Sequence, residues 1–163
     1  MDVRNKKEYY LEPFRRVIME NHVEGVMTSY NEINGVPAIV NPEMNQVLRK
    51  QWGFKGHFVC DMEDLGQTRT AHHYVKSDEM ALKLALQAGI DIFNDPDEFV
   101  VNTAAKALEQ GVITKEEIDV AVRHSLQSRF RLGIYDTLGN CSYFKEGMEQ
   151  VDCSEHRKIC LEV

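Results

Sequence analysis

The chain has 163 residues, of which 43% are hydrophobic, and a formal net charge of −7. Its length fits about one domain of the usual ~100–200 residues, and no apolar run is long enough to cross a bilayer. A nucleic-acid partner is not expected, because phosphate binding needs clustered Lys and Arg, which this acidic sequence lacks. The charged start, residues 1–7, has no apolar core and therefore resembles neither a signal peptide nor a membrane anchor.

Helices and strands are predicted to alternate from the start of the chain. Tyr10, Phe14 and Ile18 follow one another at helical spacing. The combination of Asn34-Gly35 with Pro37 favours turns over regular structure. In chain order we expect a helix over residues 5–20 with a break at Pro13, a strand over 24–30, a loop over 31–37, and a helix that Asn41 caps and that stops near residue 53.

The same alternation continues to the last predicted helix. Thr114 and Glu117 form a capping box, and an apolar stripe of Ile118, Val122 and Leu126 follows at four-residue spacing. In chain order we expect a strand over residues 56–61, a helix that Ser77 caps and Gly89 ends, a strand over 90–93, a helix over 97–110, and a helix from Thr114 to Gly133. The tail from residue 154 resembles the first turns of a further helix.

This order of elements indicates an α/β fold, because helix and strand alternation yields a parallel sheet covered by helices. A closed barrel needs eight strands and usually ~250 residues, so the chain resembles an incomplete (β/α)8 TIM-type barrel of about three βα units. An open doubly wound sheet is the alternative. The sequence contains neither G-x-G-x-x-G nor G-x-x-x-x-G-K-[ST], so no motif supports nucleotide binding by such a sheet.

Asp61 is the principal candidate for chemistry. It closes the apolar strand that begins at His57, and barrel enzymes keep their catalytic groups at the carboxyl ends of such strands. An isolated Asp at a strand end also fits a residue that begins a turn or caps a helix. The acidic residues that follow, Glu63 and Asp64, fit a solvated loop.

The cysteines and histidines do not form a second candidate site as well supported as Asp61. His72 and His73 are adjacent, so their side chains diverge, and no third ligand has suitable spacing; we expect neither a metal nor a cofactor. Cys60 reads as a core residue of an apolar strand rather than a catalytic thiol. The tail cysteines and the sequon at Asn140-Cys141-Ser142 are short signals that lean toward an extracellular location and leave the compartment open.

The segment from Gly25 to Ala38 resembles the signature loop of glycoside hydrolase family 3. Similar segments follow in the family's order at Trp52-Gly53-Phe54, Ala88-Gly89-Ile90-Asp91 and Arg129-Phe130-Arg131. The resemblance implies that residues 1–135 are the C-terminal part of the family's N-terminal barrel domain. It also implies that residues 136–163 are a linker toward a second domain.

The resemblance aligns Asp61 with the nucleophile of a retaining β-glycosidase. It places Met27 and Tyr30 in the sugar-binding subsite, and Met62 directly after the nucleophile. Without the resemblance, Met27 and Tyr30 fit ordinary packing in a barrel core. Glucosidase-like members usually have Trp at the position of Met62, so the xylosidase-like branch and a β-xyloside or xylo-oligosaccharide substrate are favoured over a β-glucoside, with arabinose also open.

The resemblance also implies that the acid/base glutamate and most hydroxyl-binding residues belong to parts of the family that this chain does not include. We therefore expect a fragment that does not hydrolyse an aryl β-xyloside alone and whose partner is the remainder of its own barrel and second domain. The rival hypothesis is a non-catalytic pseudoenzyme or interaction module derived from the same barrel.

Overall fold

The computed structural model describes residues 1–137, 140 and 145–162. It divides into two compact units, Met1–Ser128 and Arg129–Val163. Within the described ranges, no helix combines the length and the apolar character that crossing a bilayer requires. The sequon at Asn140-Cys141-Ser142 falls partly on residues 141–142, which lie outside the described residues.

The first unit contains the whole sheet, and the second contains short helices. The elements of the first unit are α1 (Val3–Asn5), the π-helix η1 (Lys6–Tyr10), α2 (Glu12–Asn21), β1 (Gly25–Met27), β2 (Glu32–Ile33), β3 (Val36–Pro37), the 3-10 helix η2 (Ala38–Val40), the π-helix η3 (Met44–Gln51), β4 (His57–Met62), α3 (Asp64–Thr70), α4 (Asp78–Ala88), β5 (Ile92–Asn94), α5 (Asp97–Glu109) and α6 (Lys115–Arg131), whose last three residues belong to the second unit. The second unit adds η5 (Met148–Gln150) and α7 (Ser154–Glu162).

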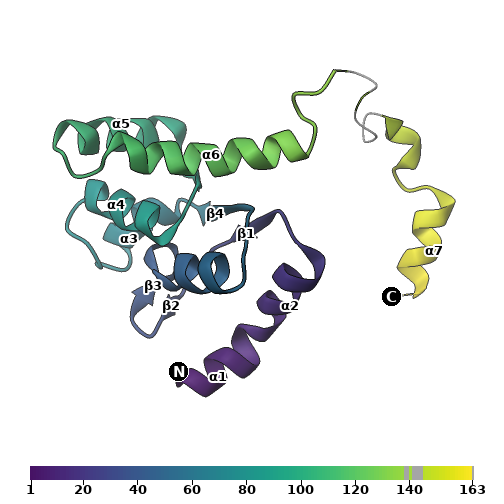
Figure 1. Ribbon diagram of the computed structural model, residues 1–163, viewed down its shortest axis with the longest axis horizontal. Helices are drawn as coiled ribbons and strands as arrows, with labels where there is room; N and C mark the ends of the chain where they lie inside the picture. The colour runs from purple at the N-terminus through teal and green to yellow at the C-terminus, as the bar shows by residue number, and fades with distance from the viewer. Residues whose placement is uncertain (138–139, 141–144, 163) are drawn as a thin grey trace. The chain divides into compact units, whose positions relative to one another are not determined.

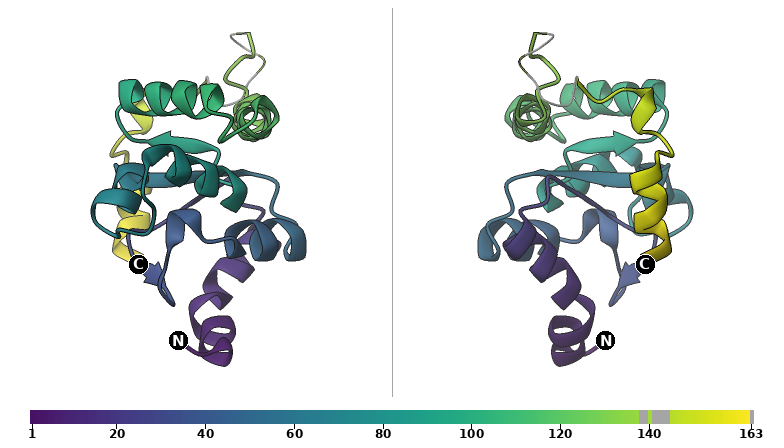
Figure 2. Two further views of the ribbon diagram at one scale, coloured as in Figure 1. Left: turned by 90° about the vertical axis from the view of Figure 1, so that its left-hand side faces the viewer. Right: turned by 90° about the vertical axis from the view of Figure 1, so that its right-hand side faces the viewer.

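The three predicted strands form one parallel sheet in the order β1-β4-β5. Met27 of β1 lies opposite Val59 of β4, which in turn lies opposite Ile92 of β5. Helices connect the strands, as parallel pairing requires. Within the first unit, α5 and α6 lie on one side of β4, and the hairpin β2–β3 lies on the other (Figures 1 and 2). The predicted α/β class is confirmed.

The predicted helical segment is divided in the structure into α1, η1 and α2, which follow one another over residues 3–21. The break lies at Leu11, two residues before Pro13, and Pro13 itself lies in the first turn of α2. A backbone N–H in a first turn has no partner within the helix, so proline is tolerated there at little cost. The chain leaves α2 at His22, which has a left-handed backbone conformation.

Residues 31–37, predicted as a loop, instead form a small antiparallel hairpin. Glu32 lies opposite Pro37, and Ile33 lies opposite Val36. Asn34 and Gly35 make the turn with positive φ angles of 52° and 82°, the conformation that a two-residue hairpin turn demands. The turn signal was recognised in the sequence, but the two short strands beside it were not.

The predicted helix starts at Ser77 and Thr114 are confirmed by their hydrogen bonds. Ser77 Oγ accepts from the Met80 amide at 3.3 Å. The cap predicted at Asn41 is wrong, because the helix begins at Met44 and its cap position is Glu43; Asn41 Oδ1 accepts from the Glu43 amide at 3.0 Å, before the helix. The capping box is reciprocal: the Thr114 amide donates to Glu117 Oε2 at 2.9 Å, and the Glu117 amide donates to Thr114 Oγ1 at 3.3 Å. These side chains satisfy amides that the first turn of a helix leaves without partners.

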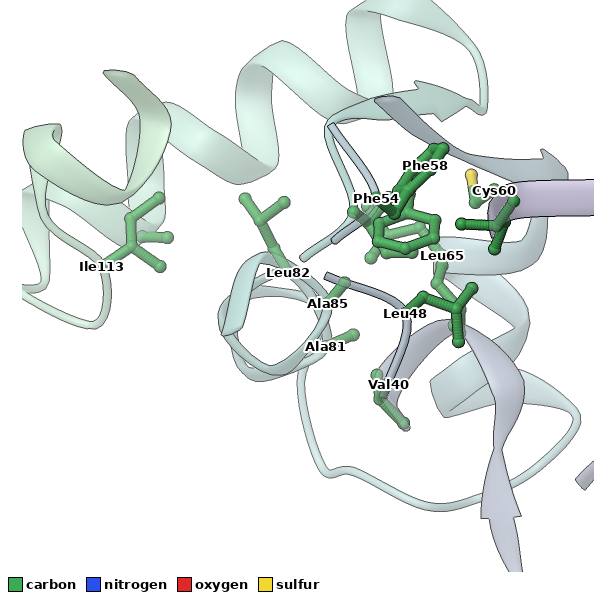
Figure 3. Close-up of a cluster of buried hydrophobic side chains, with 14 residues drawn as sticks. Val40, Leu48, Phe54, Phe58, Cys60, Leu65, Ala81, Leu82, Ala85 and Ile113 are labelled. Carbon is green, nitrogen blue, oxygen red and sulfur yellow. The ribbon is translucent and has the colours of Figure 1, made fainter. Parts of the chain in front are cut away.

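The core lies between the sheet and α4 (Figure 3). Phe58 and Cys60 of β4 are fully buried, and the ring of Phe58 packs against that of Phe54 with centroids 4.9 Å apart. Ala81 and Ala85 of α4 are also fully buried, and their small side chains allow this helix to approach the sheet closely. Because side chains alternate along a strand, Val59 and Asp61 face the opposite side of β4, where they are only half-buried.

A buried ion-pair network surrounds the start of β4. Asp91 Oδ2 accepts from Arg49 Nη2 at 2.5 Å and from the Phe58 amide at 2.8 Å, and its Oδ1 lies 2.8 Å from His124 Nδ1. The Arg49 guanidinium lies over the Phe58 ring, 4.5 Å from the centroid. Burial raises the pKa of Asp91 and lowers that of Arg49, because desolvation disfavours the charged form of each group. The ion pair between them offsets this cost of desolvation.

The backbone at the start of β4 lies very close to the backbone at Glu24. The His57 amide donates to the Glu24 carbonyl at 3.0 Å. A Cβ atom at Gly56 would overlap that same carbonyl oxygen. Glycine is therefore required at position 56 by space, because the neighbouring backbone has no flexible end that can move aside.

Candidate functional site

The candidate site is built around Asp61, the fifth residue of β4. Its carboxylate emerges on the half-buried face of the strand, at the carboxyl end of the sheet. The Met62 amide donates to Asp61 Oδ1 at 2.8 Å. This bond fixes the carboxylate relative to the turn that follows, while the side chain stays accessible from solvent.

Tyr30 and Met62 lie together beside Asp61. The Tyr30 hydroxyl donates to the Met62 carbonyl at 2.8 Å. Burial raises the pKa of Tyr30, and the negative charges of Asp61 and Asp64 act in the same direction. The hydroxyl therefore connects the segment that follows β1 with the end of β4 that carries Asp61.

Met27 ends β1 on the same face of the sheet as Asp61. It lies opposite Val59, two residues before Asp61, and it is 58% exposed; Met62 is 59% exposed. The structure thus brings Met27, Tyr30, Asp61 and Met62 to one end of neighbouring strands. Two exposed, polarizable thioether side chains therefore belong to the same end of the strands as a carboxylate and a phenol.

A cavity of about 650 Å³ lies beside β1 rather than at Asp61. Its lining is mainly apolar and includes Tyr10, Phe14, Met27 and Met44, whereas Asp61 and Met62 do not line it. Met27 and Val26 also line a second cavity, of about 390 Å³, on the same strand. The apolar cavities therefore lie along β1, whereas Asp61 and Met62 lie at the end of β4.

Asp64 is buried, contrary to the solvated loop that its sequence context suggested. Only 1% of it is exposed, whereas the neighbouring Glu63 is exposed and has a left-handed φ of 58°. Asp64 Oδ2 accepts from Thr28 Oγ1 at 3.3 Å, and its Oδ1 has no hydrogen-bond partner among the described residues. Burial raises the pKa of Asp64 to about 6. The left-handed residue turns the chain inward and so buries the carboxyl group.

Asp95, which follows β5, anchors the first turn of α3. It accepts from the Leu65 amide at 3.3 Å and from the Gly66 amide at 3.1 Å. The Cys60 thiol lies 3.7 Å from the same carboxylate, and burial raises the pKa of this thiol to about 12. Cys60 therefore stays protonated at neutral pH, which does not suit a nucleophile. Sequence reasoning missed Asp95, although a carboxylate just after a predicted strand was its signal.

The adjacent histidines have different partners. His72 Nδ1 lies 3.0 Å from Glu32 Oε1 and so connects the hairpin β2–β3 to the segment after α3. His73 Nδ1 lies 3.2 Å from the Arg69 carbonyl. In the part of the chain that the structure describes, no group of three or more His, Cys, Asp or Glu side chains has the geometry to hold a metal ion. Of the cysteines, Cys60, Cys153 and Cys160 are free, and Cys141 lies outside the described residues.

Comparison with known proteins identifies one family across most of the chain. Residues 1–127 match the model of the glycosyl hydrolase family 3 N-terminal domain. The chain is 32% identical to probable beta-D-xylosidase 6 of Arabidopsis thaliana and 34% identical to exo-1,4-beta-xylosidase bxlB of Emericella nidulans; each alignment covers 96% of this chain, and 20% and 21% of the respective relative. A solved β-glucosidase from Erythrobacter marinus is 32% identical with a TM-score of 0.73, over 78% of this chain and 17% of that one. The chain spans about a fifth of the length of the curated relatives it matches.

Proposed function

This chain belongs to glycosyl hydrolase family 3, and we propose that it is part of a retaining β-glycosidase in which Asp61 is the catalytic nucleophile. The observation that carries the proposal is the position of this carboxylate. It lies at the carboxyl end of the central parallel strand, half-buried, with the Tyr30 hydroxyl beside it. Barrel enzymes place their reacting groups at this end of the strands.

The proposed reaction proceeds in two displacements. A carboxylate oxygen of Asp61 attacks the anomeric carbon, the bond from that carbon to the glycosidic oxygen breaks, and a carboxylic acid protonates the departing oxygen. Water then attacks the same carbon, and Asp61 leaves as a carboxylate. In retaining enzymes the two carboxyl groups lie ~5–5.5 Å apart. We propose that the acid belongs to a part of the enzyme outside the matched residues.

We propose that Tyr30 orients Asp61 and that Met27 and Met62 contact the sugar. Because the Tyr30 hydroxyl bonds to the carbonyl of the residue after Asp61, it restrains the end of the strand from which the nucleophile projects. Met27 and Met62 offer exposed apolar surface at the same end of the strands as this carboxylate. Such surface suits the carbon-bound faces of a sugar ring, while hydroxyl recognition requires polar groups from elsewhere.

We propose a β-xyloside as the preferred substrate. The two curated relatives are named as β-xylosidases, and the solved relative is named as a β-glucosidase. The flexible Met62, in place of a rigid aromatic ring after the nucleophile, supports the first alternative. A β-glucoside differs from a β-xyloside by one hydroxymethyl group, so the same site architecture serves both classes.

We also propose that residues 1–135 belong to the barrel domain, that residues 136–163 link it to a second domain, and that further strands of the same enzyme complete the barrel. Among the described strands, β1 pairs only with β4, so one edge of β1 is without a strand neighbour. Both apolar cavities lie along β1. An unpaired strand edge beside apolar surface is the position at which a further parallel strand adds to a sheet.

The nucleophile is tested by covalent trapping in the longest polypeptide that the gene encodes. The reagent is a dinitrophenyl β-xyloside with fluorine on the second carbon, because dinitrophenolate departs without protonation and the fluorine slows hydrolysis of the ester. Mass spectrometry of peptides should find one fluoroxylosyl group on Asp61. The corresponding β-glucoside, used at the same concentration, should label more slowly.

Asp61→Asn is the variant that decides the assignment, since an amide oxygen does not form the ester. We expect no label in this variant and a loss of turnover on the order of 10⁴-fold or more, the size that follows removal of a nucleophile. Normal turnover by Asp61→Asn, or label on another carboxylate, would remove Asp61 from this role. A correctly folded protein that neither labels nor hydrolyses would support a non-catalytic function instead.

A further inference from the structure

Two hydrogen bonds connect the segment after β1 with residues 62 and 64, which follow Asp61 at the end of β4 and the start of α3. The exposed one joins the Tyr30 hydroxyl to the Met62 carbonyl, and the buried one joins Thr28 Oγ1 to Asp64 Oδ2. We propose that Asp64 is a positioning residue, which holds the end of β4 that carries Asp61 against the segment after β1 from the buried side. The inference rests on the proposed role of Asp61 as nucleophile.

Thr28 is well placed to transmit this restraint. Its amide donates to the Val59 carbonyl at 3.0 Å, so the residue is fixed to β4 through its backbone and to α3 through its side chain. It directly follows Met27 and precedes Tyr30 by two residues. A shift of Asp64 therefore moves the segment on which the proposed sugar contacts lie.

The placement of Asp64 is costly to the fold, which argues against a purely structural role. A buried carboxylate with one oxygen unpartnered loses solvation that a single hydrogen bond to Thr28 does not replace. Asparagine would accept the same bond without a buried charge. Groups that a fold retains at a cost of this kind concentrate at functional sites.

Asp64 is also coupled electrostatically to the site. His72 attracts its negative charge, whereas Asp95 and Asp61 repel it. Its charge also acts on Tyr30 and on the Cys60 thiol. Of the helices packed against α3, η2 carries only apolar residues. Helix α4 contributes Asp78, which pairs with Arg69 of α3 at 2.8 Å, and Glu79, which pairs with Lys106 at 2.6 Å. Loss of the Asp64 proton therefore adds a negative charge that repels the Asp61 carboxylate.

The first experiment needs no catalytic activity. The chain is labelled with ¹⁵N and with ¹³C at aspartate carboxyl carbons, and its NMR spectra are recorded from pH 4 to pH 8. We expect the Asp64 carboxyl to titrate with a midpoint near pH 6 and the amides of Tyr30 and Met62 to shift with the same midpoint. In Asp64→Asn that inflection should disappear from both amides while the other signals keep their dispersion.

Three variants separate position from charge and from loss of folding. Glu63→Gln removes one charge from the exposed neighbour, so the inflection at Tyr30 and Met62 should persist. Thr28→Val removes the hydroxyl donor and should shift both amides at every pH, and Thr28→Ser should restore them. The proposal would be overturned if the inflection persisted in Asp64→Asn. It would also be overturned if the amide shifts of Tyr30 and Met62 did not change as Asp64 titrates.

The second experiment measures the pH profile of covalent labelling at Asp61 in the longest gene product. Positioning by Asp64 predicts an inflection near pH 6 in the wild type that Asp64→Asn lacks, whereas a merely structural residue lowers the rate equally at every pH. If Asp61 is not labelled in the wild type, the proposed function fails, while the NMR titration still decides whether Asp64 sets the arrangement of the turn. If Asp61 is labelled with the same profile in both proteins, the positioning role fails alone.

Discussion

Replacement of Asp91 by asparagine should destabilise the first unit strongly, because it leaves the Arg49 guanidinium buried without its counter-charge. The Arg49 side chain is only 11% exposed, and the Asp91 side chain is 1% exposed. Removal of one partner from such a buried pair costs about 3–5 kcal/mol. Domains have total free energies of unfolding of about 5–15 kcal/mol, so this single change removes a large fraction of the stability.

Urea unfolding, followed by far-UV circular dichroism, measures this loss. For a typical dependence of 1–3 kcal/mol per molar urea, a loss of about 4 kcal/mol lowers the midpoint by roughly 2 M. Asp97→Asn, at an exposed position in the first turn of α5, serves as the charge-matched control and should change the midpoint little. The double variant Arg49→Met with Asp91→Asn should recover part of the loss, since it leaves no unpaired cation.

A loss below about 1 kcal/mol in Asp91→Asn would refute this reasoning, because it would mean that water reaches Arg49 and solvates it. The same holds if the double variant loses the sum of the single losses, since coupled partners are not additive.

The remaining predictions concern pH and backbone space. The raised pKa of Asp64 means that the folded state binds more protons than the unfolded state between pH 3.8 and about 6, so stability should fall as pH rises through this interval, by about 3 kcal/mol. The free energy of unfolding, measured with urea at pH 4 and pH 7, should therefore decline by about 3 kcal/mol less in Asp64→Asn than in the wild type. An equal decline in both proteins would contradict the prediction. Gly56→Ala should lower the thermal midpoint far more than Gly111→Ala, where a Cβ meets nothing within 4 Å and only the positive φ of 66° causes strain; equal shifts would mean that the backbone at Glu24 yields.

Local signals in the sequence identified most of the fold. Ser77 and Thr114 were predicted as caps from the residues that follow them, and their hydrogen bonds confirm it. The hairpin at 32–37 was missed because its strands are two residues long, too short for alternation to show. Helix α3 was missed because its sequence contains Gly66 and two β-branched threonines, and because Asp95, which is distant in sequence, anchors its first turn.

Burial of individual side chains was harder to predict than the elements themselves. The apolar stripe of α6 includes Val122 and Leu126, yet both are exposed, while Ala121 and Ser128 are buried. Spacing establishes that a helix is amphipathic, but small residues that fit a close approach decide which face packs. Asp64 shows the same limit, because its sequence neighbours are acidic and only the left-handed backbone at Glu63 turns it inward.

The residues proposed for the site were identified by resemblance rather than by local pattern. Asp61 stood out as a carboxylate at a strand end, but Met27, Tyr30 and Met62 had no distinguishing signal of their own. The structure places all four at one end of β1 and β4, and their roles stay predictions. Thr28 and Asp64 were not singled out, since a bond between residues 36 positions apart leaves no trace in local spacing.

The pairing of Phe58 with Asp91 has a consequence at the far end of β4. Cys60 and Asp61 are neighbours on opposite faces, so a slip of the strand register by one residue would present a protonated thiol where the carboxylate now stands. The Phe58 amide bond to Asp91 and the tight fit at Gly56 both oppose such a slip. The buried charges at the start of the strand thus select which functional group the sheet presents at its other end.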